Sequence, residues 1–295
     1  MKILVTGATG FLGSHLVRAL LKRGHQIIVL KRSFSDLSRI SDLMSSVETY
    51  DIDKMDLSLP FAEQGHIDVV IHAATCYGRN KERVTDIVQA NMAFPLQLLT
   101  SAVSAKISAF INTDTSLEMF LNPYALSKKQ FKDWGVLAAN QRGITFINLE
   151  LEHFYGPGDD HSKFVTMLIR KCLQNVKELN LTAGEQKRDF IHIDDVVSAY
   201  LLILDQLQIK KPSFKNYSLG SGNTIAVRAL VEKIHVMTGS HTVLNFGAIP
   251  YRQNEVMDSC ADITALNSLG WTPKISLDNG LGMTIPYEKQ RLQKG

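Results

Sequence analysis

The chain has 295 residues, 45% of them hydrophobic and 21% charged, and its 32 basic and 29 acidic side chains give a net charge of +3. This length and composition predict a globular protein of two domains or one large α/β unit, and exclude a disordered, collagen-like or coiled-coil protein. The near balance of charge gives no indication of binding to nucleic acid or to an anionic membrane surface.

Short apolar runs alternate with amphipathic stretches along most of the chain. The runs predict buried strands at 3–5, 26–30, 69–71, 109–111 and 145–149, and helical stretches are expected at 15–22, 84–104, 124–140, 164–173 and 193–204. Strands that alternate with helices form βαβ units, so we expect an α/β fold with a doubly wound parallel sheet. From about residue 240 the elements are short and separated by glycine and proline, which predicts a smaller C-terminal α/β lobe.

The cysteine, histidine and hydropathy patterns indicate whether the chain is expected to bind a metal or to insert into a membrane. Three widely spaced cysteines, without a C-x-x-C pair, argue against a disulfide framework or a structural zinc site. The histidines show no ligand spacing, so we expect no metal. No apolar run reaches the length of a membrane span, and the N-terminal run is too short for a signal peptide. We therefore expect a cytoplasmic protein with no membrane partner.

A glycine-rich segment joins the first expected strand to the first expected helix. Residues 6–13 read TGATGFLG, and a strand–turn–helix context is the one in which such a segment binds a dinucleotide. Gly7 permits a tight turn, Gly10 lets the backbone approach a pyrophosphate, and Gly13 permits close packing of the helix on the sheet. The helix N-terminus then offers free N–H groups to the phosphates. The alternative is a glycine-rich connection without a ligand.

The end of the second expected strand bears on which dinucleotide binds. An NAD site usually has an acidic residue there to accept from the ribose 2′-hydroxyl. This chain has Lys31, Arg32 and Ser33 instead, and two cations with a hydroxyl suit a 2′-phosphate. These residues favour NADP(H), with a solvated pair of cations as the alternative.

Tyr124 and Lys128 are one helical turn apart in a stretch expected to be helical. Free tyrosine has a pKa of about 10, and a nearby cation stabilises the phenolate, which makes the phenol usable in proton transfer. A pair at this spacing is often a surface pair. Downstream of a glycine turn it predicts a catalytic pair.

Together these features resemble the extended short-chain dehydrogenase/reductases, the NAD-dependent epimerase/dehydratase family. The resemblance covers nearly the whole chain and rests on the glycine turn, the Tyr124/Lys128 pair, His72-Ala73-Ala74, Asn91 and the segments FYGPG (154–158) and RDFIHIDDV (188–196). The segments CYGR (76–79), ELEHFYG (150–156) and SCADI (259–263) are similar to the branch of CDP-paratose and CDP-abequose synthases. The resemblance implies a Rossmann-like fold and NADP(H) as the cofactor. It also implies reduction of the 4-keto group of a nucleotide-linked 6-deoxy or 3,6-dideoxy hexulose, with CDP as the expected nucleotide. The product would serve the synthesis of O-antigen or related glycans.

The resemblance also implies a catalytic hydroxyl after the strand at 109–111. Thr115 is expected in this role, with Thr113 as the alternative. Tyr124 would protonate the forming alkoxide, Thr115 would polarise the carbonyl group, and Lys128 would hold the nicotinamide ribose and tune Tyr124. The Asp-Glu pair of the family's 4,6-dehydratases is absent, because Thr115 and Ser116 follow Asp114. Its absence argues against elimination chemistry.

Binding residues follow from the same resemblance. Cofactor contacts are expected from Gly7, Thr9, Gly10, Phe11, Leu12, Gly13, Lys31, Arg32, Ser33, Asp56, Leu57, Ala73, Ala74, Asn91, Tyr124, Lys128 and Leu151. Contacts to the sugar nucleotide are expected from Tyr77, Arg79, Thr113, His153, Lys163, Phe164, Arg188, Arg252 and Glu255. Several alternatives stay open: an Arg188–Asp189 ion pair, an Arg252–Glu255 ion pair, a core position for His153, and simple packing for Tyr77.

The expected organisation is a dinucleotide-binding domain over 1–155 and about 190–235, and a sugar-nucleotide lobe over about 156–189 and 236–295. Relatives commonly dimerise through two helices, here 84–104 and 124–140, which implies a homodimer, although the same apolar positions fit packing on the sheet. Two other functions compete. An epimerase on the same scaffold typically retains NAD, so Lys31 and Arg32 count against it. A non-catalytic NADP-binding regulator has no need of the Tyr124/Lys128 pair. The nucleotide base, the C4 configuration and deoxygenation at C3 stay open.

Overall fold

The structure, a computed structural model, describes residues 1–207 and 212–294. The chain forms two compact units: unit 1 is Met1–Glu150 with Tyr200–Tyr217, and unit 2 is Leu151–Ala199 with Ser218–Gly295. Residues 208–211 and 295 of the expected domains lie outside the described residues. The expected dinucleotide-binding domain differs from unit 1, since residues 190–199 and 218–235 belong to unit 2. The reason is strand pairing, because β7 (His153–Tyr155), β11 (Thr224–Ala226) and β13 (Asp258–Ser259) all pair with β9 (Lys187–His192).

The remaining elements alternate as expected. The other strands are β1 (Lys2–Thr6), β2 (Gln26–Lys31), β3 (Glu48–Asp51), β4 (Val69–His72), β5 (Ala109–Thr115), β6 (Thr145–Leu151), β8 (Glu178–Leu181), β10 (Phe214–Leu219) and β12 (Val243–Phe246). The helices are α1 (Phe11–Lys22), α2 (Leu59–Glu63), α3 (Val84–Val88), α4 (Phe94–Ser104), α5 (Pro123–Gln141), α6 (Phe164–Leu173), α7 (Ile193–Asp205), α8 (Val227–Thr238), α9 (Thr264–Ser268) and α10 (Leu277–Lys294), with a 3₁₀ turn at Ser41–Ser46 and a π-helical turn at Gln89–Ala93.

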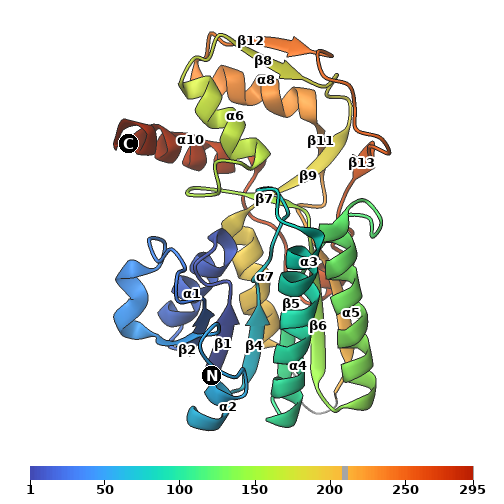
Figure 1. Cartoon of the computed structure of the whole chain (residues 1–295). Helices are drawn as coiled ribbons and strands as arrows, with labels where there is room; N and C mark the ends of the chain where they lie inside the picture. The colour runs from blue at the N-terminus through green and yellow to red at the C-terminus, as the bar shows by residue number, and fades with distance from the viewer. Residues whose placement is uncertain (208–211, 295) are drawn as a thin grey trace. The chain divides into compact units, whose positions relative to one another are not determined.

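The sheet of unit 1 has the strand order β10-β6-β5-β4-β1-β2-β3, and its pairs from β3 to β5 run parallel (Figure 1). Its central strands are apolar and buried on both faces, as parallel sheets require. Because β1 lies between β2 and β4, the strand order reverses there. Ligands of doubly wound sheets bind outside the carboxyl ends of the strands at such a point.

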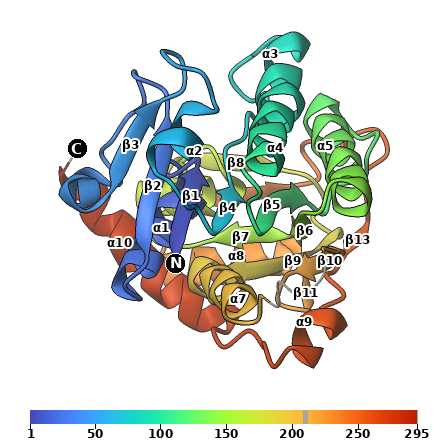
Figure 2. The same ribbon diagram turned by 90° about the horizontal axis from the view of Figure 1, so that it is seen from below.

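Two long helices of unit 1 cover this sheet. Figure 2 shows α4 and α5 on one of its faces. The helix α5 approaches the sheet closely, because a Cβ on Gly135 would lie 2.2 Å from the Phe146 ring. The rings of Phe110, Phe131 and Phe146 pack together beneath it with centroids 5.6 to 5.8 Å apart. Burying each ring contributes roughly 2 kcal/mol, which anchors the helix that carries the predicted catalytic pair.

The stretch at 84–104 is not one regular helix. It consists of α3, the π-helical turn and α4, with Pro95 at the start of α4. Proline lacks an N–H and its ring clashes with the carbonyl group four residues earlier, so regular α-helix is broken at Asn91. Wide turns of this kind are common at functional sites.

Unit 2 has its own core. The helices α6, α8 and α10 pack around a buried apolar cluster that includes Leu168, Ile169, Leu230, Ile234 and Leu281. The strands β8 and β12 pair parallel beside the small sheet built on β9.

Candidate active site

The glycine turn between β1 and α1 has the geometry that the sequence predicts. Gly7 has a φ of +72°, and a Cβ added to it would lie 2.5 Å from the Ala74 nitrogen, so only glycine fits. Gly13 is equally restricted, since its Cβ would lie 2.1 Å from the Gly7 carbonyl oxygen. Helix α1 begins after Gly10 with no side-chain cap and no acidic residue in its first turn. Its N-terminal N–H groups are therefore available to an anion.

The end of β4 is fastened to this turn. The buried His72 ring is hydrogen-bonded through Nδ1 to the Thr6 hydroxyl at 2.7 Å, and the Ala74 N–H donates to the same oxygen at 3.3 Å. Burial, and then the charge of Lys128, lower the pKa of His72 well below its usual value, so the ring is neutral. Ala73 and Ala74 thus lie against Gly7, which brings two of the expected cofactor segments together.

The three residues at the end of β2 are engaged with acidic residues or an aromatic ring. Lys31 forms an ion pair with Asp51, and the Ser33 hydroxyl donates to Asp53 at 2.6 Å. The exposed Arg32 guanidinium lies 4.7 Å from the centre of the Phe34 ring. Arg32 is therefore the residue of this group whose cation has no acidic partner within residues 1–207 and 212–294.

The other expected cofactor residues lie in unit 1, except Leu151. Asp56 accepts from the Ser58 N–H and hydroxyl in a tight turn, and Leu57 packs on the core. Thr9 is half-buried, while Phe11 and Leu12 are buried in the first turn of α1. Leu151, at the end of β6, is also buried, and it belongs to unit 2.

Asn91 holds the loop after β4 against α5. Its side-chain oxygen accepts from the Cys76 N–H at 2.7 Å and from Thr75, and its nitrogen donates to the Cys76 carbonyl and to the Ser127 hydroxyl at 3.2 Å. The side chain is fully buried in the π-helical turn. Asn91 can therefore affect a cofactor only indirectly, by fixing the position of the loop after β4.

The local sequence places Tyr124 at the start of a helix. The Asn122 side chain caps α5 by accepting from the Ala125 N–H at 2.9 Å, and Pro123 occupies the first helical position. Tyr124 therefore lies in the first turn, beside the end of β5. There the Thr115 hydroxyl interacts with its phenol and acts to lower the pKa of Tyr124.

The electrostatic surroundings keep this phenol protonated. Burial raises the pKa of Tyr124 well above its usual value, and the neighbouring Tyr77 and Asp114 add to that effect. The Thr115 hydroxyl and the charge of Arg79 oppose it without reversing it. Unliganded, the pair is thus set to give a proton rather than to take one.

Lys128 is almost completely buried, with 2% of its surface exposed. Burial lowers its pKa to about 8, against the opposing effect of the Asp114 carboxylate. Its ammonium donates no hydrogen bond to any residue within 1–207 and 212–294. Burial of the side chain makes its charged form costly, so an oxygen of a bound molecule at the ammonium would be favourable.

The two candidate hydroxyls of β5 differ in their partners. The Thr113 hydroxyl is hydrogen-bonded to the buried Tyr200 hydroxyl at 2.7 Å. The Thr115 hydroxyl accepts from the Leu117 N–H at 3.2 Å, and it is the hydroxyl that acts to lower the pKa of Tyr124. The geometry favours Thr115 over Thr113 as the hydroxyl that acts with the phenol.

Tyr77 and Arg79 lie next to the phenol. The rings of Tyr77 and Tyr124 are 5.1 Å apart, and the Arg79 guanidinium lies 4.6 Å from the centre of the Tyr77 ring. These two expected substrate residues therefore belong to the same cluster in unit 1 as Tyr124 and Thr115.

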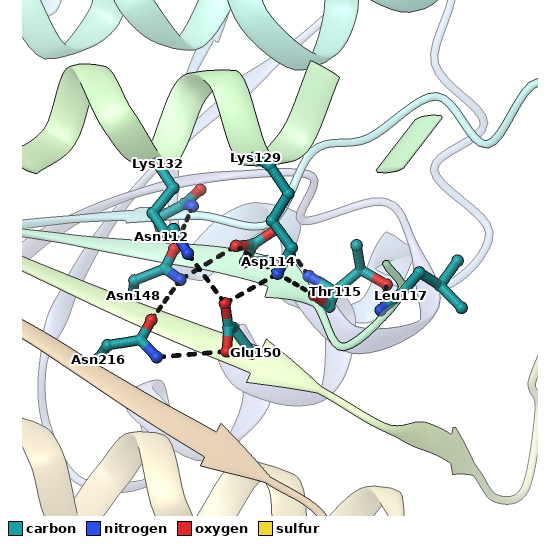
Figure 3. Close-up of polar contacts among 9 residues, drawn as sticks. All are labelled: Asn112, Asp114, Thr115, Leu117, Lys129, Lys132, Asn148, Glu150 and Asn216. Atoms are coloured by element: carbon teal, nitrogen blue, oxygen red, sulfur yellow. Dashed lines mark hydrogen bonds and ion pairs between the residues drawn. The ribbon is translucent and has the colours of Figure 1, made fainter. Parts of the chain in front are cut away.

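A network of charged and amide side chains lies behind Thr115, and sequence reasoning missed it (Figure 3). Lys129 and Lys132 reach from α5 toward the Glu150 carboxylate, with Nζ to Oε1 distances of 2.8 and 3.2 Å. The network also contains Asp114, Asn112, Asn148 and Asn216. The sequence indicates this network only by Lys129, the lysine directly after Lys128. Sequence alone cannot distinguish Lys129 from a surface lysine, because its partners come together only when β5 and β6 pair.

Several of the expected sugar-nucleotide residues belong to unit 2. Arg188 pairs with Glu255, so neither the Arg188–Asp189 nor the Arg252–Glu255 ion pair is present. Asp189 instead accepts from Ser221, Gly222 and Ala261. The Arg252 side chain is exposed.

The other expected residues of unit 2 lie near β7 and at the start of α6. His153 is half-buried, 3.3 Å from the Glu152 carboxylate and 5.6 Å from the Phe190 ring, and is not a core residue. Lys163 pairs with Asp159 at 3.0 Å and lies over the Phe154 ring. The half-buried Phe164 is the first residue of α6 and packs on the unit 2 core.

The described part of the chain has neither a metal-binding cluster nor a membrane-spanning helix. Within residues 1–207 and 212–294, no group of three or more His, Cys, Asp or Glu side chains is placed to hold a metal ion. None of the helices in that part of the chain is both long enough and apolar enough to cross a bilayer.

Comparison with known proteins identifies the family. A model of the NAD dependent epimerase/dehydratase family matches residues 3–220. The chain belongs to this family. Its sequence is 35% identical over 292 residues to CDP-abequose synthase of Salmonella typhimurium (strain LT2), with 95% of each chain covered. It is 26% identical to the putative UDP-glucose 4-epimerase of Methanocaldococcus jannaschii, which covers 97% of this chain and 98% of that one.

Solved structures of family members have the same fold. The UDP-glucuronic acid 4-epimerase from Bacillus cereus, in complex with UDP-glucuronic acid and NAD, superposes with a TM-score of 0.87 at 26% identity, over 99% of this chain and 100% of that one. UDP-glucose 4-epimerase of Thermotoga maritima gives a TM-score of 0.86 at 25% identity, with the same coverage. The resemblance drawn from the motifs and the Rossmann-like fold are thereby confirmed. Members of the family act on nucleotide sugars with a nicotinamide dinucleotide.

Proposed function

We propose that the protein reduces the 4-keto group of a CDP-linked 6-deoxy or 3,6-dideoxy hexulose with NADPH, as a cytoplasmic homodimer. One feature carries the proposal: a protonated, half-buried Tyr124 interacts with the Thr115 hydroxyl and lies one helical turn from the Lys128 ammonium. The identity to CDP-abequose synthase supports the choice of the CDP-linked substrate.

The residues of unit 1 fit a dinucleotide. The uncapped N-terminus of α1 behind Gly10 would take the pyrophosphate, and the Lys128 ammonium would take the hydroxyls of the nicotinamide ribose. Arg32 would take the 2′-phosphate, because its guanidinium offers a planar fork of donors and has no acidic partner in the described part of the chain. When bound, the reduced nicotinamide supplies a hydride.

The side chains supply the proton and orient the carbonyl group. Hydride addition to C4 converts the ketone oxygen into an alkoxide, and Tyr124 gives this oxygen its phenolic proton. Thr115 donates a hydrogen bond to the same oxygen and stabilises the charge that develops on it. Lys128 then favours the tyrosinate left behind, because a nearby cation lowers the free energy of a phenolate.

Each unit by itself offers side chains suited to part of a sugar nucleotide. In unit 1 the Tyr77 ring, backed by Arg79, offers an apolar face to a hexose ring. In unit 2 the exposed Arg252 is available to a diphosphate, and Arg188 reaches one only by sharing its guanidinium with Glu255.

The test is NADPH oxidation with enzymatically prepared CDP- and dTDP-linked 4-keto sugars, with the product configuration at C4 read by NMR. We expect stoichiometric oxidation with the CDP-linked ketone. Tyr124→Phe should fold, bind NADPH and lose activity by about 10²–10⁴-fold. Absence of NADPH consumption with every ketone, or full activity in Tyr124→Phe, would contradict the proposal.

A second candidate is an epimerase, because the structural neighbours include NAD-bound 4-epimerases. An epimerase returns its hydride to the sugar, so it would interconvert C4 epimers without net consumption of NADPH and would be purified with NAD bound. The same assay therefore separates the two functions.

A further inference from the structure

Thr115 lies where the sheet no longer fixes the backbone of β5 on its β4 side. The pairing of β4 with β5 ends at His72 and Asn112, so the last three residues of β5 project beyond the end of β4. An irregular segment follows, with the exposed Phe120 at 77%. A hydroxyl that has to meet a forming alkoxide needs a rigid backbone, and on the β4 side groups other than the sheet must provide that rigidity.

Two charged side chains hold the backbone of Thr115 at both of its polar groups. Its N–H donates to the Asp114 carboxylate at 2.8 Å, and its carbonyl oxygen accepts from the Lys129 ammonium at 2.6 Å (Figure 3). The remaining two donors of Lys129 reach Glu150 at 2.8 Å and Asp114 at 3.3 Å. An ammonium has three N–H donors, so each of them has an acceptor.

The network is balanced in charge and anchored to two further strands. Asp114, whose side chain is completely buried, also accepts from Asn148 of β6 at 3.0 Å. Glu150 of β6 accepts from Asn216 of β10 at 3.2 Å. Burial tends to raise the pKa of Glu150, but the Lys129 hydrogen bond and charge, with help from Asn216 and Lys132, hold that pKa below its usual value. The two carboxylates thus face the two ammonium groups of Lys129 and Lys132.

We propose that Lys129 is a positioning residue for the reduction: its ammonium ties the Thr115 carbonyl to the carboxylates of Asp114 and Glu150, and so aims the Thr115 hydroxyl at Tyr124 and the substrate oxygen. The inference rests on the proposed function for its consequence in catalysis, although the geometry it describes exists without substrate. Lys129 touches neither cofactor nor substrate in this assignment and acts through Thr115.

Lys132 provides a matched control. It lies one turn further along α5 and binds the same Glu150 oxygen, at 3.2 Å, but it forms no hydrogen bond with Thr115. If the network had a purely structural role, Lys129→Met and Lys132→Met would have the same effect on kcat. A positioning role of Lys129 separates them.

The experiment measures kcat, KM, NADPH affinity and stability for both variants. We expect Lys129→Met to lower kcat by about 10- to 100-fold, because small misplacement of a catalytic group has effects of this size. Its NADPH affinity should be unchanged, whereas Lys132→Met should keep the wild-type kcat. Equal loss of kcat in the two variants, or an unchanged kcat in Lys129→Met, would overturn the inference.

Lys129→Met leaves Asp114 without a cation in contact, so it is also combined with Asp114→Asn, which restores the charge balance. The double variant should fold and show the same loss of kcat, beyond that of Asp114→Asn alone; no further loss would refute the inference. Amide hydrogen exchange at Thr115 and Leu117, measured without substrate, should be faster in Lys129→Met than in Lys132→Met. If wild-type protein reduces no ketone, the proposed function fails, and this exchange experiment still decides whether Lys129 holds Thr115.

Discussion

We predict that the buried charge of Lys128 lowers the free energy of unfolding of the protein, although the proposed activity requires this residue. Burial lowers its pKa from 10.5 to about 8, and at about 1.4 kcal/mol per pKa unit the charged form in the native state costs about 3 kcal/mol at pH 7. Methionine has a similar length and no charge, so Lys128→Met should unfold with a free energy up to about 3 kcal/mol higher than wild type. The same variant should lose reductase activity and bind NADPH more weakly.

The pH dependence gives this prediction its sign. Between pH 8 and 10.5 the unfolded chain holds the Lys128 proton and the native protein has begun to lose it, so wild-type stability rises with pH over this window relative to the variant. The advantage of Lys128→Met should therefore shrink from about 3 kcal/mol at pH 7 to about 1 kcal/mol at pH 9.5.

Urea denaturation at the two pH values measures this effect. Trp134, on α5 in unit 1, reports on the unit that contains Lys128, while the buried Trp271 reports on unit 2. Lys129→Met is the control of opposite sign, because its ammonium is fully hydrogen-bonded and its removal should destabilise. A Lys128→Met variant no more stable than wild type at pH 7, or an advantage independent of pH, would refute the reasoning.

Three further predictions concern the turn, the hydroxyls and the cofactor. Thr115→Val should lower kcat by about 10²–10³-fold, and Thr113→Val should cost about 1 kcal/mol of stability with a smaller effect on kcat; the reverse order in steady-state kinetics would assign the catalytic hydroxyl to Thr113. Gly13→Ala puts a Cβ 2.1 Å from a carbonyl oxygen and should abolish dinucleotide binding in calorimetry, whereas Gly282→Ala, with open space around it, should stabilise the protein by about 0.5–1 kcal/mol. Arg32→Ala should reduce the preference for NADPH over NADH by about tenfold, as the ratio of kcat/KM values for the two cofactors; an unchanged ratio would place the 2′-phosphate elsewhere.

Much of the site was predictable from short stretches of sequence. The turn from Gly7 to Gly13 depends on backbone conformations and close approaches that only glycine permits, and these are local properties. The one-turn spacing of Tyr124 and Lys128 depends only on the helix, whose start is set by Asn122 and Pro123. Local rules suffice where neighbouring residues provide the geometry.

The partners of single side chains could not be predicted in this way. Arg188 was expected to bind phosphate or Asp189, yet it pairs with Glu255, because β9 lies beside the segment that carries Glu255. Thr113 and Thr115 are equivalent in sequence, both on one face of β5, and only their contacts with Tyr200 and Tyr124 separate them.

By itself the sequence determined the alternation of strands and helices, the dinucleotide turn and the catalytic pair, because each is set by residues within a few positions of one another. The tertiary structure alone decided that Lys128 is buried without acceptors, that Lys129 holds Thr115, and where the chain divides into two units. These properties depend on which strands become neighbours. Burial and charge balance at each side chain are fixed only when distant segments pack together.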